Sequence, residues 1–358
     1  MQIDELETPA LLVEQPVLNA NIERMAGHCR ARQVNLRVDV GCHKIPMIAY
    51  KQLAAGACGI ACRTLSQVQT FADAGFVDIL VPRSALNDGE LKALLNAAER
   101  FKIQFAADSS SAVNEIAGLT ERKRLQTSIF IDIDDKGNRY RAMLPRETLE
   151  IARRILAVPN LKFAGVVINL ASPAASRYVN EIISRFKAAE ISIPVLSCTD
   201  IDHSFQIDQV PQITELCVGA YALYDYSHVC RNECTIADCA LAVLTTVIDS
   251  PSKNLAIVDA GMQNFTATPL KHTNQLPALS YPLDGYRAKK AFGATKHYPS
   301  ATLCHLEEVF GHLSMADNQF KVGEKVCIIP VNSETTISAH DTFAFVQGNR
   351  VLEILPIL

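Results

Sequence analysis

The feature that most constrains the fold of this chain is a regular alternation of strand-like and helix-like segments between residues 34 and 220. Short apolar runs bounded by glycine, proline or polar residues indicate buried strands. Eight such runs occur, at 34–40, 58–64, 78–84, 102–109, 127–134, 161–169, 192–198 and 213–219. Eight parallel strands with outer helices close most simply into a (β/α)8 barrel. We therefore predict an α/β protein built mainly on such a barrel.

The segments between these runs have the apolar spacing of helices, and several open with Ser, Asn, Thr or Pro, as helix capping predicts. They lie at 45–56, 64–75, 87–101, 110–119, 145–156 and 176–189. Parallel strands need connections of this kind, because a tight turn cannot return the chain to the same edge of a sheet.

The pattern changes after about Asp238, where strand-like runs follow one another with little helical periodicity between them. We predict a barrel domain at 8–237 and a β-rich domain at 238–358, the latter joined by residues 1–7. Gly348 and Asn349 are expected to form a two-residue hairpin turn. A strand-like segment at 8–15 is expected outside the eight barrel strands, with the β-rich domain.

Composition excludes some classes of function. The chain has 358 residues, 49% hydrophobic and 20% charged, with a net charge of -4 and no block of one sign. This argues against nucleic acid or a membrane surface as a partner. No apolar run approaches the roughly 20 residues that span a bilayer, and the N-terminus carries acids where an export signal carries bases. We predict a cytoplasmic protein with a small-molecule ligand.

The 11 cysteines are scattered and odd in number, which favours reduced thiols over a disulfide framework. The densest group consists of His228, Cys230, Cys234 and Cys239. Its spacing differs from that of structural zinc sites, so we interpret these side chains as packing residues rather than metal ligands.

A family resemblance rests on four stretches in order, TPALLVE, LRVDVGCHKIP, CVGAYALYDY and VDAGM. Together they make the chain similar to the D-threonine aldolase and D-serine dehydratase family, whose members are pyridoxal-phosphate enzymes with an alanine-racemase-like barrel. The resemblance implies a lyase or racemase acting on a D-amino acid, and a homodimer.

The position of the Schiff-base lysine is altered. In the family, the first barrel strand leads to a lysine that binds the cofactor, and the resemblance places that lysine at Gly41. Glycine supplies no amine, and we expect Gly41 to leave space for a different ligand. Lys44 is the alternative amine, since it lies three residues further on and its side chain is long.

The cofactor's phosphate site is altered as well. The resemblance assigns cofactor contacts to Ser197, Thr199, Asp200 and Tyr221. The family's glycines are absent after Ser197, and the carboxylates of Asp200 and Asp202 stand where a phosphate dianion would bind. Like charges at contact distance cost a few kcal/mol in a partly buried site.

The family's divalent metal site corresponds to the run from Pro330 to Thr336, in which Asn332 and Glu334 are the candidate ligands. An amide in place of an imidazole disfavours zinc, whereas the carboxylate of Glu334 could serve a harder cation.

Three interpretations of function follow. The first, which we favour, is a divergent member without covalent pyridoxal phosphate that binds a small molecule, such as an amino acid, at the barrel mouth. The second is an active pyridoxal-phosphate lyase or racemase using Lys44, with His43 and Arg139 as further catalytic candidates. The third is a structural dimer with a vestigial pocket. The predicted pocket is lined by Asp39, His43, Lys44, Arg139, Asp200 and Asp202.

Overall fold

The structure is a computed structural model that describes residues 1–82, 86–97, 101–133, 145–168, 173–199, 210–266, 268–271, 290–298, 301–314 and 320–357. It contains two compact units. One comprises Arg24–Gly41 and Ile45–Gly219, and the other comprises Met1–Glu23, Cys42–Lys44 and Ala220–Leu358. Whether the predicted segments 8–237 and 238–358 fold as separate domains stays a prediction.

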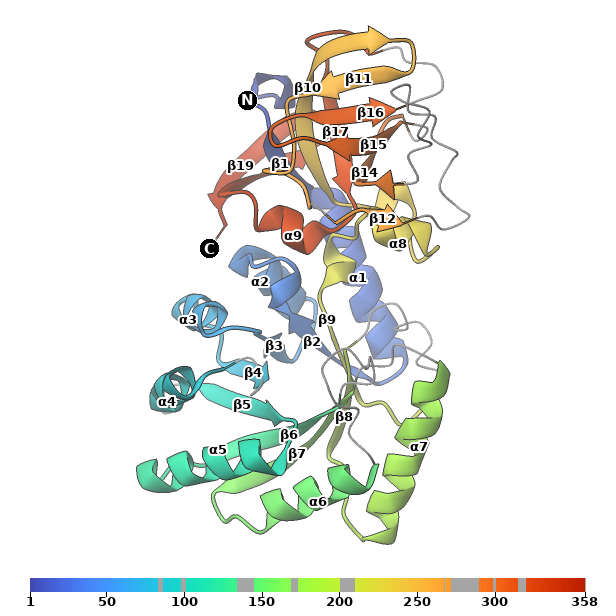
Figure 1. Cartoon of the computed structure of the whole chain (residues 1–358). Coiled ribbons are helices and arrows are strands. Elements are labelled where there is room, and N and C mark those ends of the chain that lie inside the picture. The colour runs from blue at the N-terminus through green and yellow to red at the C-terminus, as the bar shows by residue number, and fades with distance from the viewer. Residues whose placement is uncertain are drawn as a thin grey trace. The chain divides into compact units, whose positions relative to one another are not determined.

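The first unit is a closed barrel of parallel strands, as the alternation predicts (Figure 1). The strands follow chain order, and β2 pairs with β9 to close the ring. They are β2 (Asn35–Asp39), β3 (Gly59–Ala61), β4 (Asp78–Pro82), β5 (Lys102–Ala107), β6 (Thr127–Ile133), β7 (Leu161–Ile168), β8 (Val195–Cys198) and β9 (Glu215–Val218). The predicted (β/α)8 barrel is confirmed.

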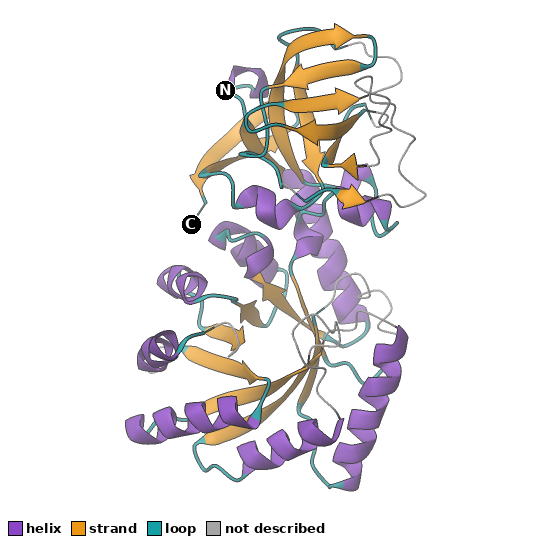
Figure 2. Ribbon diagram, in the orientation of Figure 1, coloured by secondary structure: helices purple, strands orange, loops and turns teal. Residues whose placement is uncertain are grey.

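Helices cover the outside of this barrel (Figure 2). They are α2 (Pro46–Ala54), α3 (Leu65–Asp73), α4 (Asp88–Ala97), α5 (Ser110–Lys123), α6 (Pro145–Leu156) and α7 (Pro173–Ala188). Side chains cap the N-termini of two of these helices. The hydroxyl oxygens of Thr64 and Ser109 accept hydrogen bonds from the backbone N–H groups three residues on.

An apolar layer fills the barrel interior. It is formed by Leu80, Ala106, Phe130, Ala164 and Val167, with Ala61 and Val195 packed against it. The residue after Ala164 is a glycine for a steric reason. Gly165 has φ +148°, and a Cβ on it would lie 1.9 Å from the carbonyl oxygen of Val195. This close approach coincides with a register shift between β6 and β7.

Charged groups close the N-terminal end of the barrel. Arg37 is buried; its Nε lies 3.2 Å from Glu215 Oε1 and its Nη1 lies 2.8 Å from Asp78 Oδ1. Gln104 and Lys102 also donate to the Asp78 carboxylate. Burial opposes the charge on Asp78, but the hydrogen bonds from Lys102 and Arg37 lower its pKa below the ordinary value. The charge balance at this end has a structural role, since catalytic groups of such barrels lie at the opposite end.

The second unit is built on one large sheet with strand order β11-β16-β15-β14-β17-β10-β1-β18-β19. Its strands are β1 (Ala10–Glu14), β10 (Leu241–Ser252), β11 (Leu255–Val258), β14 (Gly293–Thr295), β15 (Thr302–Leu306), β16 (Gly311–Ser314), β17 (Lys325–Pro330), β18 (Thr342–Gln347) and β19 (Arg350–Pro356). A separate pair is formed by β12 (Leu270–Lys271) and β13 (Lys290–Ala291). The predicted β-rich part is therefore present.

Two local predictions in this unit are confirmed. The N-terminal strand β1 lies outside the barrel ring and pairs with β10 and β18. Gln347 pairs with Arg350, which leaves Gly348 and Asn349 as the turn of the terminal hairpin. The left-handed φ of Gly348, +57°, is one that such a turn requires.

The remaining helical segments are short apart from α1 (Gln15–Ala31). They are α8 (Tyr226–Cys230), α9 (Ser333–Ile337) and the 3-10 turns η1 (Ile3–Glu5), η2 (Val40–Cys42), η5 (Ala220–Ala222) and η6 (Ile236–Asp238). Among the described residues, no helix is both long enough and apolar enough to cross a bilayer.

Candidate functional site

The C-terminal end of β2 carries the position that the sequence singles out. The strand ends at Asp39 and passes into η2, which contains Gly41. Asp39 Oδ1 accepts a hydrogen bond of 3.0 Å from the backbone N–H of Gly41. The φ of Gly41 is outside the left-handed range, so its backbone does not require glycine. The space around it decides what this position can hold.

Arg63 occupies that space. It follows β3, the neighbour of β2, and donates to Asp39 Oδ2 from Nη2 at 2.7 Å and from Nε at 3.2 Å. A Cβ on Gly41 would lie 2.7 Å from Arg63 Nε and 2.9 Å from Arg63 Cδ. The expectation that Gly41 leaves room for a ligand is therefore wrong, because the guanidinium held by Asp39 fills this room.

Arg63 is the site residue that sequence reasoning missed. It stands at the C-terminal edge of a strand next to the one that ends at Asp39. Parallel neighbours end at the same edge of a sheet, so an acid and a base in these two places are expected to meet. That signal was present in the stretch CGIACRT. The Arg63 side chain is 44% exposed and that of Asp39 is 19% exposed, so the pair lies where a ligand can reach it.

Ser197 is a buried hydroxyl inside the barrel. It lies two residues after Val195 on β8, so both side chains point to the interior face. Ser197 is 0% exposed, and its Oγ has no hydrogen-bond partner among the described residues. A buried hydroxyl without a partner costs about 1–3 kcal/mol. Thr199, further along, is half-buried and its N–H donates to Ile168 O at 3.0 Å.

Three predicted residues lie outside the described part of the chain. They are Arg139, Asp200 and Asp202, which fall in the ranges 134–144 and 200–209. Their assignment to the pocket stays a prediction.

His43 and Lys44 belong to the second compact unit. His43 is fully buried. Lys44 has a left-handed φ of +58°, and its Nζ donates a hydrogen bond to Ser338 Oγ at the C-terminal end of α9. This bond engages the amine that the sequence offers as the alternative to position 41.

Tyr221 lies in η5 and is fully buried. Four residues on, Asp225 caps α8. Its Oδ1 accepts hydrogen bonds from Ser227 and from His228 Nδ1, the latter at 2.7 Å, and its Oδ2 accepts from the backbone N–H of Ser333 at 3.0 Å. Burial opposes the charge on Asp225, but the hydrogen bond and charge of His228, with the bond from Ser227, lower the carboxyl pKa.

The candidate metal ligands lie at the start of α9. Asn332 is its N-cap, and Asn332 Oδ1 accepts a hydrogen bond of 2.9 Å from the N–H of Thr335. Glu334 is half-buried in the same helix. Within the described residues, no three His, Cys, Asp or Glu side chains gather as a metal site would require. Whether Asn332 and Glu334 bind a metal stays a prediction.

The cysteines are all free thiols, and all eleven lie in the described part of the chain. Cys234 is hydrogen-bonded to Cys239, whose thiol has a raised pKa because of that bond and its burial. Cys230 is hydrogen-bonded to Tyr226. Whether this group serves packing alone stays a prediction.

Two family descriptions match the chain. "Alanine racemase, N-terminal domain" matches residues 14–199, and "Putative serine dehydratase domain" matches residues 240–346. The first match covers more than half of the chain.

The chain belongs to this alanine racemase family of fold type III pyridoxal-phosphate enzymes. It is 30% identical over 274 residues to the D-threo-3-hydroxyaspartate dehydratase of a Delftia species, covering 72% of each chain. It is 22% identical over 380 residues to the 3-hydroxy-D-aspartate aldolase of Paracoccus denitrificans, covering 100% of this chain and 93% of the relative. Its homologues are thus D-amino-acid aldolases and dehydratases.

The fold agrees with this membership. The crystal structure of D-threonine aldolase from Filomicrobium marinum superposes with a TM-score of 0.84 at 21% identity, covering 99% of this chain and 95% of that one. The predicted alanine-racemase type of barrel with a C-terminal β-rich part is therefore confirmed.

At position 41, where the resemblance places the cofactor's lysine, this chain has no amine. A Schiff base needs a primary amine, and position 41 offers a glycine under the Arg63 guanidinium. The pair of Asp39 and Arg63 can instead orient a charged small molecule, because an arginine fork recognises carboxylate and phosphate groups.

Proposed function

We propose that this family member does not hold pyridoxal phosphate as a Schiff base and that it binds an anionic small molecule non-covalently at the barrel mouth. The observation that carries the proposal is the position of Arg63. Its guanidinium stands over Gly41, where the resemblance places the cofactor-binding amine. A lysine at position 41 would have to displace Arg63 from Asp39.

Arg63 is the group that would bind the ligand. Its side chain keeps its charge at all physiological pH values, and 44% of it is exposed. Asp39 fixes the orientation of the guanidinium from one side through Oδ2. A carboxylate or phosphate group approaching from the exposed side would share the guanidinium with Asp39.

Ser197 adds a polar group without a described partner to the barrel interior, where its register partner on β9 is Glu215. Its buried Oγ, which has no partner among the described residues, can bond to a ligand or to an ordered water beneath it. The hydroxyl would then stabilise binding by relieving its own desolvation.

The alternative is a pyridoxal-phosphate lyase on a D-amino acid with Lys44 as the Schiff base. The names of the relatives favour it, since they are aldolases and dehydratases of hydroxylated D-amino acids. The hydrogen bond from Lys44 Nζ to Ser338 Oγ counts against it.

The first experiment separates these two functions. Purified protein is mixed with pyridoxal phosphate, reduced with borohydride and digested for mass spectrometry. Our proposal predicts no aldimine absorbance and no modified lysine in the barrel mouth. A reduced pyridoxyl adduct on Lys44 would establish the alternative.

The second experiment tests ligand binding. A thermal-shift screen of amino acids, keto acids and phosphorylated metabolites should find compounds that raise the Tm, because a ligand that binds only the native state stabilises it. R63M should abolish the shift by keto acids and phosphorylated metabolites. R185M is the matched control, because Arg185 forms an exposed pair with Glu181 on α7. A shift by a keto acid or a phosphorylated metabolite that survives R63M unchanged would contradict the proposal.

A homodimer, which the resemblance implies, is part of the same proposal. Light scattering coupled to gel filtration measures the mass directly, and a monomer of 39.2 kDa would contradict it.

A further inference from the structure

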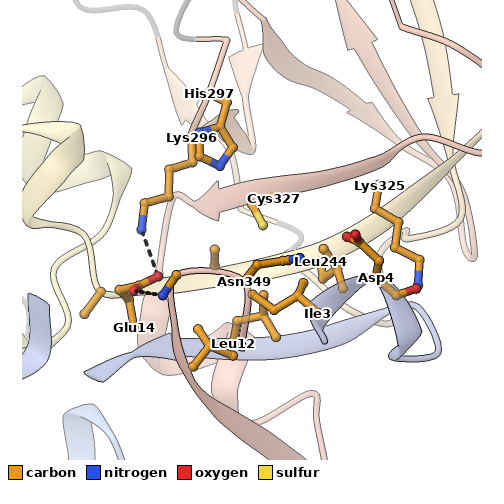
Figure 3. A pocket seen from close by; sticks show the side chains of 14 residues that line it. Ile3, Asp4, Leu12, Glu14, Leu244, Lys296, His297, Lys325, Cys327 and Asn349 are labelled. Atoms are coloured by element: carbon orange, nitrogen blue, oxygen red, sulfur yellow. Dashed lines mark hydrogen bonds and ion pairs between the residues drawn. The ribbon is translucent and has the colours of Figure 1, made fainter. Parts of the chain in front are cut away.

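A cavity lies on the large sheet of the β-rich unit, and its lining residues differ from those of the candidate functional site. Its volume is about 360 Å³. It spans the adjacent strands β17, β10, β1 and β18 (Figure 3). Cavities of roughly 300–1,000 Å³ are the usual size of small-molecule sites.

The floor of this cavity is apolar. Its side chains come from the same face of the four strands, as their register shows: Leu12 pairs with Ala242, and Leu244 pairs with Cys327. Val346, from β18, completes the floor. Leu12, Leu244 and Val346 also belong to one buried apolar cluster. The floor is therefore packed and apolar, and it suits a short hydrocarbon group.

An acid and a base stand together at one end of this floor. Lys296 follows β14, and its Nζ lies 4.0 Å from Glu14 Oε2, which Figure 3 shows. Glu14 Oε1 accepts a hydrogen bond of 3.0 Å from Gly348 N. The two side chains are only 20% and 22% exposed. The 4.0 Å between Lys296 Nζ and Glu14 Oε2 exceeds hydrogen-bonding distance. Within the described part of the chain, no hydrogen bond from Lys296 Nζ is found.

The opposite end of the cavity has a different character. Lys325 Nζ donates to the backbone carbonyls of Asp4 and Leu6, so that ammonium has a structural role. The Asp4 side chain is exposed. Only the end with Glu14 and Lys296 thus presents a partly buried charge pair with spare hydrogen-bonding capacity.

We propose that this cavity, defined by Glu14, Lys296 and the floor of Leu12, Leu244 and Val346, binds an apolar α-amino acid. Such a ligand carries its ammonium and carboxylate on one carbon, with a hydrocarbon side chain on the other side. The ammonium faces Glu14 Oε2, the carboxylate accepts from Lys296 Nζ, and the side chain lies on the apolar floor. Each charged group of the ligand is then paired with a side chain of opposite charge by charge-assisted hydrogen bonds. The site goes beyond the barrel mouth and does not depend on its function.

Calorimetric titration of the full chain with leucine, in both enantiomers, tests the site. Two probes lack one charge each: 4-methyl-2-oxopentanoate has no ammonium, and 3-methylbutylamine has no carboxylate. We expect leucine to bind at least about tenfold more tightly than either, since each loses a charge-assisted pair. Equal binding of the keto acid or the amine would overturn the assignment, as would absence of leucine binding.

Variants place the binding at this cavity. K296M and E14Q should each weaken leucine binding about tenfold or more, whereas K321M, an exposed lysine of the same unit, and R185M, in an exposed pair on α7, should leave it unchanged. Loss of leucine binding in R63M, with K296M unaffected, would move the ligand to the barrel mouth and overturn the proposal.

Cys327 gives a readout that needs no variant. It lines the cavity, and burial raises the pKa of its thiol to about 11. Leucine should slow its alkylation by a maleimide, as mapped by mass spectrometry. Cys58, an exposed thiol of the barrel unit, is the internal control and should react at an unchanged rate. Equal protection of both thiols, or of neither, would contradict occupation of the cavity.

Discussion

Arg63 Nε lies 2.7 Å from the point that a Cβ on Gly41 would occupy. The identity of residue 41 and the ion pair of Arg63 with Asp39 are therefore coupled: a side chain at 41 and the present position of the guanidinium exclude each other.

The coupling predicts the behaviour of G41K. Alone, it should reduce the free energy of unfolding by about 1–3 kcal/mol, because the new side chain crowds the Arg63 guanidinium. In the background of R63A, the same change should cost at least about 1 kcal/mol less. Urea denaturation measures both. G118K is the control, because a Cβ on Gly118 in α5 meets nothing within 4 Å; replacing this helical glycine should be neutral or stabilising. Equal costs of G41K in both backgrounds would refute the coupling.

The network at the base of the barrel gives a second prediction. R37M leaves the buried carboxylate of Glu215 and the partly buried one of Asp78 without their arginine. We expect a loss of about 3–5 kcal/mol in the free energy of unfolding, as for other buried pairs that lose one partner.

The charge-neutral double variant R37M/E215Q should recover part of this loss, because it removes the uncompensated carboxylate. R185M, in an exposed pair, should change stability by less than about 0.5 kcal/mol. If R37M unfolded at the same urea concentration as R185M, the network would have no structural role.

The sequence predicts the scaffold well because the scaffold depends on periodic apolar burial. The eight barrel strands, the strand β1 outside the ring and the hairpin at Gly348 all follow from local patterns. The site is harder, because its geometry depends on which side chains fill a space. From the sequence, a glycine at position 41 suggests an empty space. In the structure, the Arg63 side chain, which extends from the neighbouring strand, fills that space. Likewise, the sequence suggests Asn332 as a weak metal ligand. In the structure, the Asn332 side chain caps helix α9.

The cap at Asn332 gives a third prediction. N332A should destabilise the protein by about 1 kcal/mol, the usual cost of losing an N-cap, whereas N332D should retain most of the stability. Both are compared by their Tm with and without a chelator. A Tm of the unaltered protein that falls with the chelator, and no such fall in N332A, would show that Asn332 binds a metal instead.

Asp225 connects two helices, since it caps α8 and also accepts from Ser333 N at the start of α9. Its pKa is lowered in the folded state, because the bonds from His228 and Ser227 outweigh the effect of burial. A carboxyl whose folded pKa is depressed contributes stability that is fully present above its unfolded pKa, about 3.9, and lost as the pH falls through the folded value. The stability difference between the unaltered protein and D225N should therefore be large near neutral pH and should shrink below about pH 4.

Urea denaturation at a series of pH values measures this difference. D249N is the matched control, because Asp249 is exposed on β10 and should give a small difference at every pH. A D225N difference that stays constant from about pH 6 to about pH 3 would show that the charge of Asp225 does not stabilise the junction of α8 and α9.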